Sequence, residues 1–127
     1  MKRTLKVRYE NASKTPNEPI FTTKDIMEIF KFSSQATAQR FDKSGLVCAK
    51  RNSIGHRVYS YNQIELMKKL QKLVEFDISH FTIKTLMEFE KAKGRDPIVY
   101  LEELAEFYTK RTYSANRNAA RKKKKTK

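Results

Sequence analysis

Cysteine, glycine, proline and tryptophan are scarce in this sequence of 127 residues, which contains one Cys, three Gly, three Pro and no Trp. The single cysteine, Cys48, excludes an internal disulfide, and with the two isolated histidines, His56 and His80, it makes no cluster of metal ligands. The scattered glycines form no phosphate-binding loop, and the chain shows neither paired carboxylates nor a nucleophile beside a base. We therefore expect a protein that is not an enzyme and that carries no metal and no cofactor.

Long hydrophobic runs are also missing from the chain. No segment approaches the roughly 20 consecutive apolar residues that a membrane-spanning helix needs, and residues 1–14 are polar without the pattern of a signal peptide. Eight Phe and six Tyr within a hydrophobic content of 39% are enough to bury one modest core. We expect a single small cytoplasmic domain with terminal extensions, in a reducing compartment and with no membrane partner.

Acidic residues are outnumbered, with 14 Asp and Glu against 28 Lys and Arg, which gives a net charge of +14. The excess is concentrated in three places. Residues 1–14 hold five cations against Glu10, residues 31–60 hold six against Asp42, and residues 110–127 hold nine cations and no acid. A folded basic sector with basic ends suits a polyanion, and nucleic acid is the commonest one. For the tail, a merely solvated charge run is the alternative.

The pattern of helix caps predicts two short helices separated by a tight turn. Thr22 and Asp25 have the spacing of a capping box, and apolar residues follow them at helical spacing. Ser34 can cap a second helix over residues 35–44, and Gly45 can end it in the left-handed conformation. Two helices so close in sequence form a helix-turn-helix, although an αα-hairpin uses the same caps.

The outer face of the second helix favours the helix-turn-helix. Its side chains are small, amide-bearing or cationic, which suits a helix lying in the major groove of DNA, whereas solvent-facing helices normally mix charges. The residues that we assign to DNA contact from this recognition helix are Ser34, Gln35, Ala36, Thr37, Gln39, Arg40 and Lys43. A glutamine amide can bond adenine in two places, and arginine can bond guanine or a phosphate.

A β-hairpin follows the second helix. Its first strand is predicted at 46–51, where the sequence changes from apolar to basic, and its second strand at 56–60. The turn between them contains Gly55, which can adopt a positive φ. A two-stranded hairpin directly after a helix-turn-helix is a wing, and we expect Cys48 to lie buried in its first strand. Its residues assigned to DNA contact are Lys50, Arg51, Asn52, His56, Arg57 and Tyr59. The Lys and Arg side chains would clamp phosphates and Tyr59 would add a hydroxyl contact, with packing beneath the wing as the alternative for Tyr59.

Three further helices are predicted after the wing. Ser60 and Ser79 supply caps for the first two, and the second of these ends at Gly94. The last helix covers about residues 97–112 and opens on a proline, which favours a first helical position. The residues assigned to dimerisation on one face of it are Leu101, Leu104, Ala105 and Tyr108. Packing of this face against the preceding helices in a monomer is the alternative.

These patterns divide the chain into four parts. Residues 1–20 form a basic N-terminal arm, in which residues 5–9 form a short strand or an extended segment. Residues 21–94 form the winged helix-turn-helix, 95–115 the C-terminal helix and 116–127 a disordered basic tail. The tail residues assigned to non-specific DNA contact are Arg117, Arg121, Lys122, Lys123, Lys124 and Lys125. The expected fold is mainly α: a winged helix-turn-helix with a two-stranded β wing and additional C-terminal helices.

Several short motifs carry a resemblance to a known family. The stretch FTTKDI at 21–26 has an aromatic residue, a Thr and an acidic first turn. The stretch SQATAQRFDKSGL at 34–46 contains, in order, Ser, Thr, an aromatic residue, an acidic residue and Gly-Leu. The stretch GHRVYS at 55–60 has the order Gly-x-Arg-x-Tyr-Ser. With FDISHFTIKTL at 76–86, these motifs make residues 21–90 similar to the winged helix-turn-helix of the MerR family of bacterial regulators. The resemblance implies DNA binding and dimerisation.

Two departures from the family pattern bear on function. Ala38-Gln39 stands where the family has a Leu-Arg pair, so a phosphate contact is missing or moves to Arg40. The chain also lacks the cysteines or the ligand domain that the family's metal and drug sensors place beyond the dimer helix. The resemblance therefore does not imply effector sensing.

The combined patterns predict a sequence-specific protein that binds double-stranded DNA as a homodimer. We expect a small transcription regulator of a bacterium, plasmid or phage, cytoplasmic and associated with the nucleoid. A DNA-organising protein, such as a plasmid or chromosome segregation factor, an excisionase or a nucleoid anchor, would use the same wing and is the first alternative. A protein that binds RNA or the ribosome through its basic ends is the second.

Overall fold

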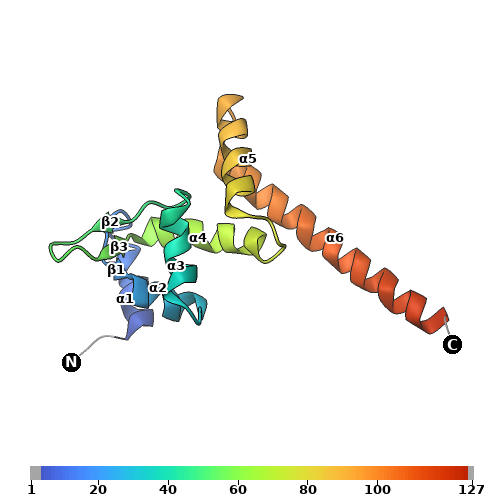
Figure 1. Ribbon diagram of the computed structural model, residues 1–127, viewed down its shortest axis with the longest axis horizontal. Coiled ribbons are helices and arrows are strands. Elements are labelled where there is room, and N and C mark those ends of the chain that lie inside the picture. The colour runs from blue at the N-terminus through green and yellow to red at the C-terminus, as the bar shows by residue number, and fades with distance from the viewer. Residues whose placement is uncertain (1–3, 126–127) are drawn as a thin grey trace. The chain divides into compact units, whose positions relative to one another are not determined.

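The computed structural model describes the backbone of residues 4–125 and the side chains of residues 4–111. In chain order the elements are α1 (Leu5–Ala12), β1 (Phe21–Thr22), α2 (Thr23–Phe30), α3 (Gln35–Lys43), β2 (Lys50–Arg51), β3 (Arg57–Tyr59), α4 (Tyr61–Val74), α5 (His80–Ala92) and α6 (Pro97–Lys125) (Figure 1). They fall into two compact units, one up to Lys68 and one from Lys69 onward. The mainly helical chain with a small antiparallel sheet confirms the predicted fold class.

The sheet of the first unit has three antiparallel strands in the order β1-β3-β2. β2 and β3 form the predicted wing, in which Arg51 pairs with Arg57. The sequence pattern does not predict β1, where Phe21 pairs with Tyr59, because a strand of two residues is too short to show alternation and its second residue, Thr22, is the helix cap. Its pairing ties the wing to the start of the helix-turn-helix. The largest buried side chains of this unit are Phe21, Ile26, Phe41, Tyr59, Ile64 and Met67.

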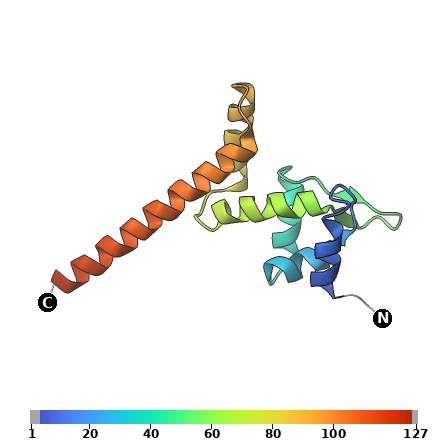
Figure 2. The same cartoon turned by 180° about the vertical axis from the view of Figure 1, so that it is seen from behind.

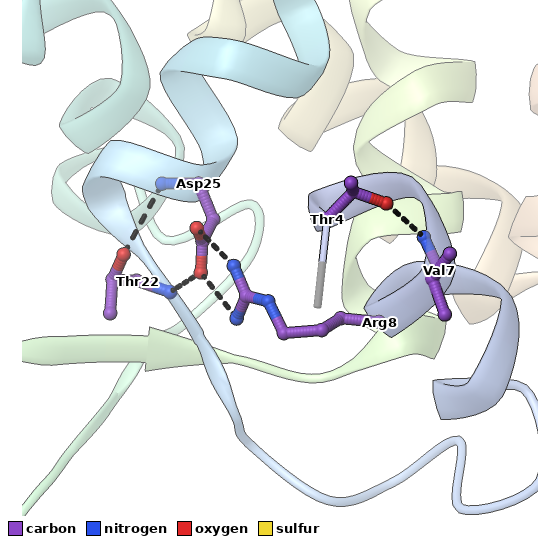
Figure 3. A network of polar contacts seen from close by, with 5 residues as sticks. All are labelled: Thr4, Val7, Arg8, Thr22 and Asp25. Carbon is purple, nitrogen blue, oxygen red and sulfur yellow. Dashed lines mark hydrogen bonds and ion pairs between the residues drawn. The ribbon is translucent and has the colours of Figure 1, made fainter. Parts of the chain in front are cut away.

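The helix-turn-helix has the caps that the sequence predicts. Thr22 and Asp25 form the capping box of α2: the Asp25 N–H donates to Thr22 Oγ1 (3.2 Å), and the Thr22 N–H donates to the Asp25 carboxylate (3.1 Å) (Figure 3). Lys31 follows α2 with a φ of 57°, Ser34 caps α3, and Gly45 turns the chain away with a φ of 79°. Each of these caps depends on residues within a few positions of one another, which is why the sequence predicts them.

The N-terminal segment forms a helix, so the prediction of a strand or an extended segment over residues 5–9 is wrong. α1 is capped by Thr4, whose hydroxyl accepts a backbone N–H of the first turn at 3.3 Å. The Tyr9 ring centroid lies 5.7 Å from that of Phe21 and 4.8 Å from that of Tyr61, and α1 lies beside the start of α2 (Figure 2). Contacts with residues distant in the sequence stabilise this helix, and alternation over five residues cannot reveal them.

Cys48 is exposed, so the expectation that it lies buried in a strand is wrong. The first wing strand is shorter than predicted, because the backbone before Lys50–Arg51 bonds to α3 rather than to a neighbouring strand. In particular, the Ala49 N–H donates to the Asp42 carboxylate at 2.8 Å. Because of this bond the Ala49 N–H does not pair within the sheet, and Cys48 lies in a segment that connects α3 to β2.

The second unit contains the end of α4, together with α5 and α6. Ser79 caps α5 as predicted, with its hydroxyl accepting the Thr82 N–H at 3.1 Å. The rings of Phe76 and Tyr108 stack with 5.5 Å between centroids. The fully buried side chains of this unit include Leu70, Leu73, Ile83 and Leu101. This core packs α6 against the shorter helices before it.

α6 extends beyond the predicted end near Thr112 and reaches Lys125. The extension contains no Pro or Gly after Pro97 and is rich in Ala, Lys and Arg, which have high helix propensity. The helical backbone of residues 116–125 differs from the disordered tail predicted for residues 116–127. The side chains of the tail residues assigned to DNA contact, Arg117, Arg121, Lys122, Lys123, Lys124 and Lys125, lie outside the described ones.

Candidate nucleic-acid interface

A groove of about 430 Å³ opens on the first unit between the start of α2, the recognition helix α3 and the wing. Its lining residues are Thr22, Thr23, Lys24, Gln35, Gln39, Arg51, Gly55, His56 and Arg57. None of the nine is acidic, and most carry a cation or a hydrogen-bond donor. The structure thus brings together predicted contacts from the recognition helix and from the wing, in a concave surface suited to a polyanion.

The start of α2 lines this groove although no DNA contact is predicted there. Thr22, Thr23 and Lys24 are the cap and the first two residues of the helix. The first turn of a helix leaves backbone N–H groups without intrahelical partners, and the helix dipole favours an anion beside them. Lys24 adds a full positive charge. The capping box marks this helix end in the sequence, but its place beside the basic wing depends on the folded chain.

The recognition helix divides its predicted contacts between the groove and open surface. Gln35 and Gln39 line the groove, one helical turn apart. Ala36, Arg40 and Lys43 are exposed outside it. The helix therefore presents two amides to the groove and two cations beside it.

Two other predicted contacts of this helix are less accessible. The Ser34 hydroxyl accepts the Ala36 N–H at 3.1 Å, so it acts as the cap of α3. Thr37 is half-buried, and the neighbouring Ala38 is buried against the core. These residues fix the position of α3.

Arg57 joins the wing to the recognition helix. Its Nε donates to the Asp42 carboxylate at 2.8 Å, and its side chain is only 17% exposed. The second Asp42 oxygen accepts the Ala49 N–H at 2.8 Å. Burial alone would raise the pKa of Asp42, but the hydrogen bonds from Arg57 and Ala49 outweigh it and hold that pKa below its ordinary value. Because the Arg57 Nε donates to Asp42, the two terminal nitrogens of the guanidinium are the ones that can donate to a partner in the groove that Arg57 lines.

The wing turn is fixed by its own hydrogen bonds. Asn52 Oδ1 accepts the N–H groups of Ile54 (3.1 Å) and His56 (2.9 Å), so this predicted DNA contact uses its side-chain oxygen within the turn. Gly55 adopts a φ of 83°, which closes the turn as predicted, and Arg51 donates to its carbonyl at 3.0 Å. The turn also presents Ile54, which is 71% exposed and is not among the predicted contacts.

Residues 21–90, more than half of the chain, match the family described as MerR HTH family regulatory protein. The chain belongs to the MerR HTH family. Neither the curated proteins nor the solved structures that were compared give a match. The matched residues run from β1 into α5 and contain the whole groove, whereas α1 and α6 lie outside them. The helix-turn-helix is thus that of a DNA-binding transcription regulator.

Tyr59 of this MerR-family domain is fully buried, so the predicted hydroxyl contact to DNA is wrong and the alternative, packing beneath the wing, holds. Among the described residues, its hydroxyl has no hydrogen-bond partner. Burial raises the pKa of Tyr59 to about 12. Lys50, a further predicted wing contact, is exposed but lies outside the groove.

The residues predicted to form a dimer interface lie in different environments. Leu101 is fully buried in the second unit and offers no surface to a partner, so its assignment is wrong. Leu104, Ala105 and Tyr108 are half-buried. Phe107, which was not assigned, is 59% exposed. A groove of about 470 Å³ between α4 and α6 is lined by Lys69, Lys72, Leu101, Glu102, Ala105, Glu106, Thr109 and Lys110.

Two further classes of site are absent from the part of the chain that the structure describes. None of its helices combines the length and the apolar character needed to cross a membrane. Within the same residues, no three His, Cys, Asp or Glu side chains gather as a metal site requires.

Proposed function

We propose that this MerR-family protein is a sequence-specific transcription regulator of a bacterium, plasmid or phage, and that it binds duplex DNA in the groove between α2, α3 and the wing. The observation that carries the proposal is the joint lining of that groove by a helix N-terminus, two recognition-helix amides and two wing arginines. Specific binding needs phosphate contacts for position and base-edge contacts for sequence, and this surface offers both. On this proposal the protein acts by binding alone, without catalysis or a cofactor, in the cytoplasm at the nucleoid.

The phosphate contacts come from two sides of the groove. Lys24 and the N–H groups of the first α2 turn hold one stretch of backbone. Arg51 and Arg57 hold another from the wing, with Arg57 oriented by its hydrogen bond to Asp42. Lys50 and His56 extend this basic edge. These contacts are independent of sequence and weaken as salt rises.

The base contacts come from the two amides of α3. Gln35 and Gln39 are four residues apart, which is about 6 Å along the helix axis, whereas stacked base pairs are about 3.4 Å apart. The two amides therefore contact base pairs about two steps apart. A glutamine pairs best with adenine, so we expect an adenine preference of about 1–3 kcal/mol at each position. Arg40, exposed beside them, is left for guanine or phosphate.

Selection of bound duplexes from a random pool tests this reading. The wild type should enrich two adenines about two base pairs apart, and Gln39→Ala should relax the preference at one of them. The matched control is Gln71→Ala, which removes an amide from α4 outside the groove. An unchanged preference in Gln39→Ala would overturn the base-reading role.

Competition between nucleic acids separates this function from its rivals. Duplex DNA should displace bound probe more effectively than RNA of equal length, because the groove combines a wing with a helix shaped to the major groove. A preference for RNA would contradict the proposal. Spreading over many adjacent sites, in place of discrete footprints, would indicate a DNA-organising role.

We also propose that the protein binds DNA as a homodimer through the second unit. Phe107 exposes a large apolar ring on α6, beside the half-buried Leu104 and Tyr108. A two-fold dimer would place two recognition helices on half-sites one helical turn apart. Phe107→Asp should sediment as a monomer, whereas Phe81→Asp, which changes a ring on α5 that is 80% exposed, should sediment as the wild type does. A wild type that is monomeric when it saturates duplex would contradict the dimer.

A further inference from the structure

α1 precedes the residues that match the family, yet it contributes a charge to the edge of the proposed DNA groove. Arg8 reaches from α1 to Asp25 at the start of α2 and donates to both carboxylate oxygens, at 2.8 and 3.4 Å (Figure 3). Among the described ion pairs, it is the link between α1 and the helix-turn-helix. The side chain of Asp25 is only 12% exposed, so its charge is poorly screened by water.

Asp25 lies directly behind the part of the groove that would meet a phosphate. It is the third residue of α2, and the three residues before it, Thr22, Thr23 and Lys24, all line the groove. Its carboxylate also accepts the Thr22 N–H at 3.1 Å. A carboxylate at this place completes the cap of α2, but its negative charge opposes the approach of a phosphate to the same helix end.

Arg8 is held in place by the packing of α1. Tyr9, its neighbour, packs its ring against Phe21 and Tyr61, and Ala12 on the same helix is buried. The Arg8 guanidinium also lies 6.0 Å from the centroid of the Phe21 ring. These contacts hold the Arg8 cation at the capping box, with its side chain 38% exposed.

We infer that Arg8 is a positioning residue for DNA binding: it neutralises Asp25 and so lets the α2 N-terminus and Lys24 hold a phosphate. This inference rests on the proposed function of the groove. It makes α1 part of the DNA-binding domain although the family match begins after it. Asp25 keeps its role as helix cap, and Arg8 removes the electrostatic cost of that role at the binding surface.

A double-mutant cycle on Arg8 and Asp25 tests the inference. Binding is measured to a mixed-sequence duplex of roughly 30 base pairs, because phosphate contacts do not depend on sequence. Arg8→Gln leaves an unneutralised carboxylate and should weaken binding about three- to tenfold. Asp25→Asn keeps a capping side chain, frees the Arg8 cation and should bind at least as tightly as the wild type. The double variant restores the local charge of the wild type and should bind within about twofold of it.

Melting temperature provides the readout that separates this role from a purely structural one. Asp25→Asn breaks an ion pair and should lower the melting temperature while it preserves or tightens DNA binding. If affinity instead follows melting temperature across the four proteins, Arg8 acts only through stability and the inference is overturned. Lys6→Gln, which removes a cation of α1 that is not paired with Asp25, is the matched control and should change affinity by less than about twofold.

The salt dependence of binding gives a second, independent outcome. If Arg8 contacts a phosphate itself, Arg8→Gln lowers the slope of log K against log salt by about one. In that case the double variant binds DNA as weakly as Arg8→Gln alone. That result would overturn the neutralising role. A wild type that fails to retain duplex at all would contradict the proposed function, whereas normal wild-type binding with no effect of Arg8→Gln contradicts the inference alone.

Discussion

At the scale of single residues, Tyr59 shows how the wing is supported from below. Its ring is fully buried, and its hydroxyl has no hydrogen-bond partner among the residues described. Leaving a buried hydroxyl without a partner costs about 1–3 kcal/mol. Tyr59 lies opposite Phe21 in the pairing of β1 with β3, and the buried aromatic body of its side chain stabilises the core while the hydroxyl contributes little.

Tyr59→Phe should therefore keep or raise the free energy of unfolding and leave duplex affinity unchanged. Because the pKa of Tyr59 is about 12 in the folded protein and about 10 when unfolded, the unfolded state loses this proton first. The wild type should thus lose stability as pH rises from about 10 to 12, and the variant should lose less. Denaturant unfolding at pH 7 and at alkaline pH measures both. A lower duplex affinity of Tyr59→Phe would indicate that the hydroxyl contacts DNA and would contradict its exclusion by burial.

Local chemistry explains which residues the sequence could predict. The capping box of Thr22 and Asp25, the cap at Ser34 and the positive φ of Gly55 each depend on neighbours within a few positions. The exposure of Cys48 could not be predicted in this way. It depends on a carboxylate of α3 that takes a nearby backbone amide, which is a contact made only in the folded chain.

At the scale of elements, Asp42 connects the recognition helix to the wing. It accepts one bond from Arg57 on β3 and one from Ala49 before β2. The recognition helix and the wing are therefore fixed relative to each other before DNA binds, which reduces the entropy lost on binding.

Asp42→Ala should lower the free energy of unfolding by about 1–3 kcal/mol, because the half-buried Arg57 side chain and the Ala49 N–H lose their acceptor. It should also weaken duplex binding although it removes a negative charge, since the wing is then free to move. The pKa of Asp42 is lowered in the folded state, so its contribution is present above the ordinary Asp pKa and is lost as pH falls through the folded value. Chemical unfolding at neutral and acid pH, with Glu75→Ala as an exposed control, measures this. Tighter binding by Asp42→Ala would contradict the connecting role.

The elements that the sequence missed are those defined by distant contacts. α1 depends on the packing of Tyr9 against Phe21 and Tyr61, and β1 exists only through its pairing with β3. Of the candidate site, the sequence could predict the recognition helix and the basic wing, because amides and cations mark both. It could not predict that Arg57 is tied to Asp42, nor that the start of α2 lines the same groove.

At the scale of the whole molecule, the distribution of charge sets how binding responds to salt. In the first unit Lys24, Arg51 and Arg57 line the groove, and residues 110–127 carry nine more cations without an acid. Cations in such a segment release counterions from DNA without reading sequence. They should add affinity to specific and non-specific duplexes alike.

Removal of residues 117–127 should therefore weaken binding to every duplex by a similar factor and flatten the plot of log K against log salt. Each lost phosphate contact lowers the slope by about 0.9. Filter binding over a series of salt concentrations measures the slope, with the selected site and a scrambled duplex compared. Unchanged affinity would show that the tail is only solvated.

The most direct test of the central claim, that the groove on the first unit is the DNA-binding surface, compares two charge reversals of equal size. Lys24→Glu with Arg51→Glu reverses two exposed cations that line the groove, and Lys14→Glu with Lys91→Glu reverses two exposed cations outside it. Both variants change the net charge equally. A difference between their affinities for a duplex of roughly 30 base pairs therefore reports the effect of where the charges lie and not of the total charge. The groove variant should lose at least about tenfold more affinity than its control. Equal losses in the two variants would contradict the claim.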